Sequence, residues 1–263
     1  MAAMADILVV HYRMEETQVN DPAVDAIGTY DLASGGNPPS AAGRVGNCRD
    51  VEASLTQSFS AASDPVVVMS NSYSWGLMGW CQLESKSGTM HYVGKRNGNL
   101  DYWLRYDAGV DRFQFRVYTN AMASSTDVLA DTLGSPATGT WYFVCCWYDH
   151  VLQTINICVN DGAVDSASHT GTVAGSAGAG FEIAGGGGGE LWDGTVDEIS
   201  VFKNGFPSAS NITAIYNGGT GVDLTTLLTI NDAAGGDDWT SPHRSPARSP
   251  ASRCIDRPRH LRS

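Results

Sequence analysis

The sequence has no long apolar segment and no recognisable leader. No run of residues approaches the apolar length that a membrane-spanning helix needs. Residues 1–13 lack both the basic start and the long apolar run of a signal peptide. We therefore expect a protein that is made in the cytoplasm and does not insert into a membrane.

The sequence also lacks the usual cysteine sites. Its six cysteines include no Cys-x-x-Cys pair, which argues against a zinc site. Cys145 and Cys146 are adjacent, so on a strand they point to opposite faces. We expect free, buried thiols that pack as small apolar groups, in a protein assembled in a reducing compartment.

Common catalytic signatures are absent as well. The chain contains no Gly-x-Ser-x-Gly and no His-Glu-x-x-His, the signatures of serine hydrolases and of one class of metalloprotease. The five-glycine run at residues 185–189 is not followed by the Gly-Lys-Ser/Thr of a phosphate loop. No catalytic residue is predicted, and we expect the protein not to be an enzyme.

Positive charge is scarce outside the C-terminal tail. Six of the 16 basic residues are arginines in residues 240–263, which hold one acid, so this tail carries +5 and the remainder −17. An acidic body repels phosphate groups, so nucleic acid is an expected partner only through the tail. The tail has repeated Ser-Pro and few apolar residues, which predicts disorder. Phosphate binding and a passive C-terminus both remain open for it.

The strongest pattern that is present lies in residues 139–162. Both faces of its first half are apolar or aromatic, with Trp141, Phe143, Cys145 and Trp147 on one face, which predicts a strand covered on both sides. The second half alternates apolar and polar residues, which predicts a strand with one face in water. Such a pair is typical of the centre of a β-sandwich.

The rest of the chain repeats short strands and turns. Strands are expected at residues 7–13, 30–33, 73–84, 89–95, 100–107, 111–119, 127–133, 163–170, 181–183 and 192–202, with the segment 48–60 left ambiguous. Ser208 is expected to cap one short helix. The prediction is an all-β antiparallel sandwich over residues 1–225, followed by an extension and the disordered tail at 226–263.

Five segments, in order, are similar to recurring motifs of one family. They lie at residues 11–16, 43–47, 73–83, 139–162 and 194–216. The chain thus resembles the laminin-G-like members of the concanavalin A-like lectin/glucanase superfamily. The resemblance implies a jelly-roll β-sandwich that binds glycans or protein surfaces, often with calcium, and it speaks more to fold than to activity.

Two aromatic positions are candidates for glycan binding, because an exposed ring can stack on a sugar while polar neighbours bind its hydroxyls. Trp103 lies opposite the expected core face of its strand, beside Arg105. Trp192 and Asp193 follow the glycine run. For each tryptophan, ordinary packing is the alternative interpretation.

Calcium is the one cofactor that the sequence suggests. Asp107 and Asp111 flank a short hairpin loop, which would bring two carboxylates close to free carbonyl groups. The alternative is that aspartate simply favours turns.

The leading functional hypothesis is a non-enzymatic binding or adhesion domain that contacts a glycan or a protein. The expected location is a cell surface or a virion surface, for example as a phage capsid decoration or tail protein. A second hypothesis is a structural sandwich that packs against copies of itself or a virion shell. The third is a divergent glycoside hydrolase, for which Asp193, Asp197 and Glu198 are the nearest carboxylates. Adjacent residues of a strand point oppositely, which favours a structural role for Asp197.

Overall fold

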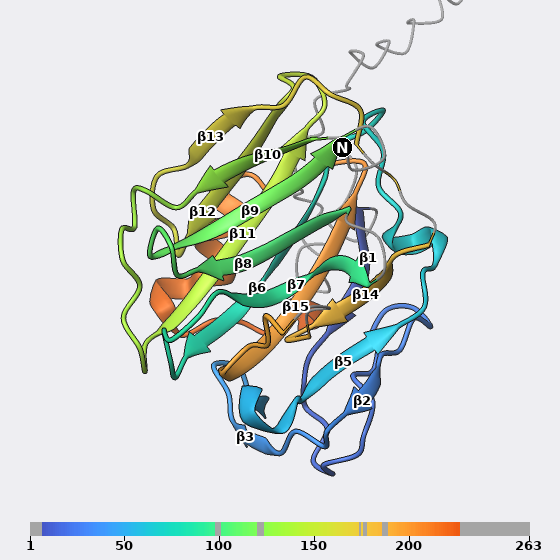
Figure 1. Ribbon diagram of the computed structural model, residues 1–263, viewed down its shortest axis with the longest axis vertical. Helices are drawn as coiled ribbons and strands as arrows, with labels where there is room; N and C mark the ends of the chain where they lie inside the picture. Colours follow the sequence, from blue (N-terminus) through green and yellow to red (C-terminus); the bar gives the residue numbers. More distant parts are fainter. Residues whose placement is uncertain are drawn as a thin grey trace, which may run out of the picture.

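The computed structural model describes residues 7–97, 101–119, 124–173, 175, 178–185 and 189–226. In these residues the chain forms two antiparallel sheets packed face to face, with one short α-helix on the outside (Figure 1). This confirms the predicted all-β sandwich. None of the helices in this part of the chain is long and apolar enough to cross a membrane. The predicted tail from residue 227 onward lies outside the described residues, and the boundary at residue 225 stays a prediction.

The first sheet has eight strands in the order β13-β12-β11-β6-β15-β4-β3, and β1 pairs with β15 beside this path. Its strands are β1 (Leu8–Tyr12), β3 (Ser40–Ala42), β4 (Asn47–Val51), β6 (Trp75–Leu83), β11 (Trp141–Asp149), β12 (Thr154–Val159), β13 (Asp165–Ser168) and β15 (Gly194–Lys203).

The second sheet has seven strands in the order β10-β9-β8-β7-β14-β5-β2 and lies nearer the viewer in Figure 1. Its strands are β2 (Ala33–Gly35), β5 (Ser58–Ala61), β7 (Met90–Asn97), β8 (Tyr102–Asp107), β9 (Arg112–Thr119), β10 (Ser124–Leu129) and β14 (Gly180–Ile183). The helices are η1 (Ala53–Leu55), η2 (Pro65–Val67), α2 (Ala209–Tyr216) and η3 (Asn217–Gly219).

Most predicted strands are present, but two are shifted: the strand expected at residues 30–33 is found at Ala33–Gly35, and β10 begins and ends earlier than expected. The apolar pattern placed it at residues 127–133, but it pairs with β9 from Ser124 to Leu129. Its first three residues, Ser-Ser-Thr, carry no apolar signal and are in the strand because the end of β9 supplies partners for their backbone groups.

Strand β11 is covered on both faces, as predicted. Its even-numbered residues from Tyr142 to Tyr148 face the core between the sheets. Phe143, Cys145 and Trp147 belong to a second apolar cluster on the outer face of the eight-stranded sheet, which helix α2 covers. Burying one large apolar side chain contributes about 1.5–3 kcal/mol, so this second cluster fixes the helix against the sheet.

The prediction of a wet face on β12 is wrong. Asn156 and Cys158 are buried on its outer side. Asn156 accepts a hydrogen bond from Ser166 Oγ on β13, and Cys158 lies in the apolar cluster under α2. Packing against β13 and helix α2 excludes water from this face, and the alternation of residues within the strand cannot indicate such packing.

Strand β15 carries a bulge that changes which residues face inward. Its pairing with β6 shifts register between Asp197 and Ser200, and Glu198 has a left-handed φ of 49°. Simple alternation along a strand would put Val196 and Ile199 on opposite faces, but both lie in the core between the sheets. The extra residue of a bulge accounts for this difference.

The bulge also marks a change of neighbour. Residues 194–196 of β15 pair with β4, and residues 199–202 pair with β1.

The five cysteines among the described residues are free and buried, as predicted. Burial raises the pKa of Cys158 to about 11, so this thiol is neutral near pH 7.

Candidate functional site

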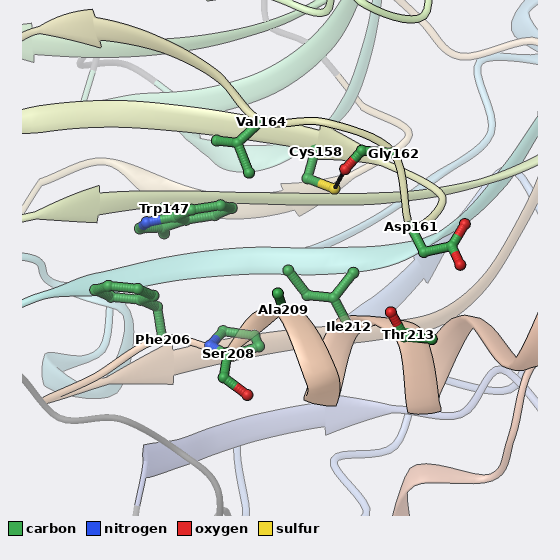
Figure 2. A pocket seen from close by; sticks show the side chains of 11 residues that line it. Trp147, Cys158, Asp161, Gly162, Val164, Phe206, Ser208, Ala209, Ile212 and Thr213 are labelled. Atoms are coloured by element: carbon green, nitrogen blue, oxygen red, sulfur yellow. Dashed lines mark hydrogen bonds between the residues drawn. The ribbon is translucent and has the colours of Figure 1, made fainter.

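A cavity of about 250 Å³ opens on the outer face of the eight-stranded sheet, between β11, β12 and helix α2. Figure 2 shows its lining, with Trp147 and Phe206 near one end and Asp161 near the other. Most of the lining is apolar, and its polar groups are Asp161, Ser208 and Thr213. An apolar hollow with a few polar groups is the usual composition of a binding site for a small molecule.

Two aromatic rings form one end of this cavity. The rings of Trp147 and Phe206 are stacked, with centroids 5.4 Å apart and planes 17° apart. Phe206 is half-buried, whereas Trp147 is buried. The stack therefore offers an apolar surface into the cavity rather than a fully exposed ring. Cys158 lines the same cavity, and its Sγ donates to the carbonyl of Gly162 at 3.2 Å.

Local sequence explains both walls of the cavity. Asn160 takes a left-handed φ of 59° in the turn after β12, and its side-chain oxygen accepts the N–H of Phe143. This turn projects the exposed carboxylate of Asp161. On the other wall, Ser208 caps helix α2 by accepting the N–H of Asn211, as predicted.

A second cavity of about 310 Å³ is lined by residues of the same turn. It shares Asp161 and Gly162 with the first cavity and adds Thr132, Asp165 and Tyr216. Thr132 donates to Asp165 from both its N–H and its hydroxyl, each at 2.9 Å. We call the two cavities together the turn groove. Among the described residues, no basic side chain lines either of them.

Sequence reasoning missed the turn groove. Asn160-Asp161-Gly162 has the pattern of a turn, and the family motifs that include this turn and residues 206–216 indicate fold rather than a binding site. The aromatic outer face of β11, directly beside that turn, was the available clue. It could not show where the cover by α2 stops.

The predicted residue Trp103 lies on the outer face of the seven-stranded sheet. Its side chain is not an exposed platform, since the residue is only 2% exposed. The guanidinium groups of Arg96, Arg105 and Arg116 lie 4.9, 5.7 and 5.6 Å from its ring centroid. Trp103 and Arg105 are therefore in contact, but the ring is covered, contrary to the expectation of stacking on a sugar.

The charges around Trp103 are paired. Arg105 contacts Asp107 at 2.7 Å and Glu190 at 3.4 Å, and its Nε donates to Gln114 Oε1 at 2.6 Å. Arg96 pairs with the same Glu190. We call Trp103, Arg96, Arg105, Arg116 and Glu190 the guanidinium patch.

The other predicted pair, Trp192 and Asp193, differs in burial. Trp192 is fully buried in the core between the sheets, where its ring lies 5.2 Å from that of Tyr92. The expectation of an exposed ring therefore fails at Trp192. Asp193 is half-buried and accepts the N–H of Ala53.

The predicted calcium residues face cationic side chains. Asp107 pairs with Arg105, and Asp111 lies 2.5 Å from Lys86 Nζ and accepts a hydrogen bond from Tyr106. The bond with Lys86 is the main cause that holds the pKa of Asp111 below its usual range. Two other groups of the described residues place three metal-binding side chains together: His11, Glu198 and Asp223, and Asp50, Glu52 and Glu84. Calcium at Asp107 and Asp111 stays a prediction.

Two of the three carboxylates considered for hydrolysis, Asp197 and Glu198, are buried. Asp197 is fully buried and accepts the N–H groups of Arg44 and Val45 at 2.7 and 2.9 Å, which matches the predicted structural role. Burial raises its pKa to about 8, and the charge of Glu198 adds to the rise. Glu198 is also buried.

The comparisons with known proteins address the family and the fold. A family model of the laminin-G type, described as the concanavalin A-like lectin/glucanases superfamily, matches residues 56–212, more than half of the chain. A search of curated proteins found no match.

Several solved structures share the fold at low sequence identity. Domain 4 of AbnA, an extracellular GH43 arabinanase from Geobacillus stearothermophilus in complex with arabinotriose, has a TM-score of 0.60 and 16% identity, with 79% of this chain and 97% of that domain covered. The binding domain of botulinum neurotoxin DC in complex with rat synaptotagmin II has a TM-score of 0.60 and 10% identity, covering 82% of this chain and 52% of that one.

A third structure is an enzyme, the Trypanosoma rangeli sialidase in complex with the inhibitor DANA. Its TM-score is 0.58 at 17% identity, with 82% of this chain covered but only 34% of the sialidase. At these identities the likeness concerns the fold, and the family match supplies the membership. The chain belongs to the concanavalin A-like lectin/glucanase superfamily, as a domain of the laminin-G-like type.

Proposed function

We propose that this protein is a non-catalytic carbohydrate-binding domain whose turn groove holds a short, neutral oligosaccharide. The observation that carries the proposal is the pair of adjoining cavities that share Asp161 and Gly162. Each is at or below the lower end of the roughly 300–1,000 Å³ of pockets for drug-sized ligands, a size that suits one sugar ring.

The chemistry of the lining supports a sugar. The Trp147–Phe206 stack supplies an apolar surface for the C–H face of a ring. The carboxylate of Asp161 accepts hydrogen bonds from sugar hydroxyls, and Thr213 Oγ1 can donate or accept. Because the described lining contains Asp161 and Asp165 but no basic residue, the groove disfavours sulfated or acidic sugars.

The comparisons agree with a binding role without defining it. The structure of the arabinanase domain, almost all of which this chain covers, is a complex with arabinotriose, and that of the neurotoxin domain is a complex with a protein, synaptotagmin II. A protein surface is therefore the second candidate partner. Neither the fold nor the comparisons favour a virion location, self-association or a shell, which stay predictions.

A glycan array with the full chain tests the proposal, run with calcium and again with a chelator. We expect binding to a neutral oligosaccharide that Thr213→Trp abolishes, because the new ring fills the mouth of the first cavity from an exposed helical position. The matched control is Ala214→Trp, one residue further along α2 and outside both linings, which should bind normally.

Four other outcomes would redirect or remove the proposal. Loss of binding in Arg105→Ala but not in Thr213→Trp would move the site to the guanidinium patch. Loss on chelation would establish a calcium-dependent lectin and return attention to Asp107 and Asp111. Absence of binding to any glycan would remove the carbohydrate proposal, and hydrolysis that Glu198→Gln abolishes would remove the non-catalytic one.

A further inference from the structure

We propose that His11, Glu198 and Asp223 bind a divalent transition-metal ion, with Zn²⁺ as the reference ion. The three residues lie on β1, on β15 and in the segment after η3. Their ligand atoms, one nitrogen and two carboxylate oxygens, all lie within 4.8 Å of one another. Three such points have a common centre at most about 2.8 Å from each, so a closure of about 0.7 Å reaches the bond lengths of zinc.

Two of the three side chains are buried without a hydrogen bond at the atoms concerned. His11 and Glu198 are more than nine-tenths buried. His11 Nε2 lies 3.2 Å from Glu198 Oε2, yet among the described residues neither that nitrogen nor either oxygen of Glu198 has a hydrogen bond of acceptable geometry. Buried polar atoms of this kind cost free energy unless a partner satisfies them, and a cation would satisfy all three.

The imidazole of His11 is oriented as a metal ligand would be. Its Nδ1 lies 2.9 Å from Ser200 Oγ on the paired strand. When Nδ1 donates to this hydroxyl, the lone pair of Nε2 points toward the carboxylate of Glu198. Metal-binding histidines commonly use their second nitrogen in this way, which fixes the ring and its tautomer.

The backbone conformation at Glu198 is strained. Its φ of 49° is left-handed, a conformation that is unfavourable for a residue other than glycine. The bulge in β15 sets this conformation beside β1. Strain at a buried acid persists where the surrounding structure requires it, and a shared ion is one such requirement.

Arg13 acts as the internal cation that the metal must displace. Its Nη2 lies 2.9 Å from Asp223 Oδ2, and its Nε lies 3.9 Å from Glu198 Oε1. The Arg13 side chain is 37% exposed, so it can turn into solvent and leave the carboxylates to the ion. The guanidinium therefore competes with the metal, and its removal should strengthen binding.

The donor set selects the class of ion. One imidazole nitrogen with two carboxylates suits zinc and related borderline ions, whereas calcium and magnesium prefer oxygen ligands alone. The site is therefore distinct from the calcium predicted at Asp107 and Asp111. It would tie the first strand and the segment after η3 to the centre of the eight-stranded sheet, and so raise the melting temperature when loaded.

The test is titration of the chelator-stripped full chain with ZnCl₂ by calorimetry, and with CoCl₂ followed by visible absorption. We expect one site that Asp223→Asn and His11→Gln each weaken about tenfold or more. Arg13→Gln should bind Zn²⁺ more tightly than the parent chain. The matched control, Asp50→Asn, alters the other acidic group and should leave the affinity unchanged.

Each result of these titrations either supports or overturns the proposal. The Co²⁺ spectrum should show a nitrogen ligand that His11→Gln removes. If that variant does not fold, Asp223, whose side chain is 25% exposed, still provides the decisive comparison. Absence of a Zn²⁺ site, or a site that Asp223→Asn leaves unchanged, overturns the proposal. Loss of the site in Asp50→Asn would assign the metal to the other group and overturn it equally.

Discussion

The two outer faces of the sandwich are covered in different ways. On the eight-stranded sheet, helix α2 lies over an apolar cluster that includes Trp80 and Phe143. On the seven-stranded sheet, Trp103 is covered by the guanidinium groups of arginines whose charges are paired within the same face. The first cover is a separate element, whereas the second is made by the face itself.

This difference explains where a ligand can enter. A helix of eight residues covers only part of a sheet, and the turn groove lies where α2 and the turn after β12 leave space between them. Long arginine side chains adapt their apolar stems to the ring beneath, which closes the guanidinium patch. We therefore expect the helix-covered face to be more important for stability and binding, and the guanidinium patch to tolerate change.

The largest expected effect is that of Trp80→Ala on the helix-covered face. The ring of Trp80 is stacked with Tyr216 of α2 and contacts Phe143. Its removal should lower the free energy of unfolding by about 3–5 kcal/mol, measured by urea denaturation. A loss below about 1 kcal/mol would show that the helix adds little to the sheet.

The helix-covered face should also lose stability as the pH rises. The folded pKa of Asp197 is about 8, against an ordinary value of 3.8, so the folded state holds a proton that the unfolded state lacks between these values. The contribution of Asp197 to the free energy of unfolding is fully present below pH 3.8. It falls by on the order of 1 kcal/mol per pH unit as the pH rises toward 8. Asp197→Asn should remove this slope. Urea melts at pH 5, 6.5 and 8 give the comparison, and parallel slopes would contradict it.

The opposite face should respond to pH with the opposite sign. Burial lowers the pKa of His91 to about 3, and the charge of Arg96 adds to the effect. The unfolded state therefore binds a proton below pH 6.5 that the folded state excludes, and stability is lost as the pH falls from 6.5 toward 3. His91→Gln should flatten this acid limb in urea melts at pH 4, 5 and 6.5. An unchanged acid limb would show that other groups cause it.

The smallest expected effect is that of Arg116→Ala in the guanidinium patch. Arg116 pairs with Asp127 through two nitrogens, but both side chains are partly exposed. We expect a loss of about 0.2–1 kcal/mol in the free energy of unfolding, since solvent screens such pairs. A loss comparable to that of Trp80→Ala would mean that the two faces are equally important for stability.

The helix start and both sides of β11 were predictable because local rules govern them. Ser208 caps α2 through contacts within three residues, and the two apolar faces of β11 require cover whatever supplies it. The inward face of β15 was not predictable from alternation, because the bulge at Glu198 depends on the switch from β4 to β1 as neighbour.

The candidate sites also differ in whether local sequence or long-range contacts determine them. The sequence placed Trp103 and Arg105 on one strand face, and their contact in the structure is consistent with that placement. The turn groove depends on Phe206 meeting Trp147, and the metal proposal on His11 meeting Glu198 and Asp223. These residues are far apart in the chain, so no local pattern could indicate that they meet.

The sequence by itself determined the all-β class, the order of most strands, the capped helix and the buried thiols, because alternation, turn chemistry and capping act over a few residues. Only the tertiary structure decided which faces are covered, that Trp192 lies in the core, and where cavities and buried carboxylates lie. Those outcomes depend on long-range pairing, in which each strand face acquires its surroundings from segments far away in the chain.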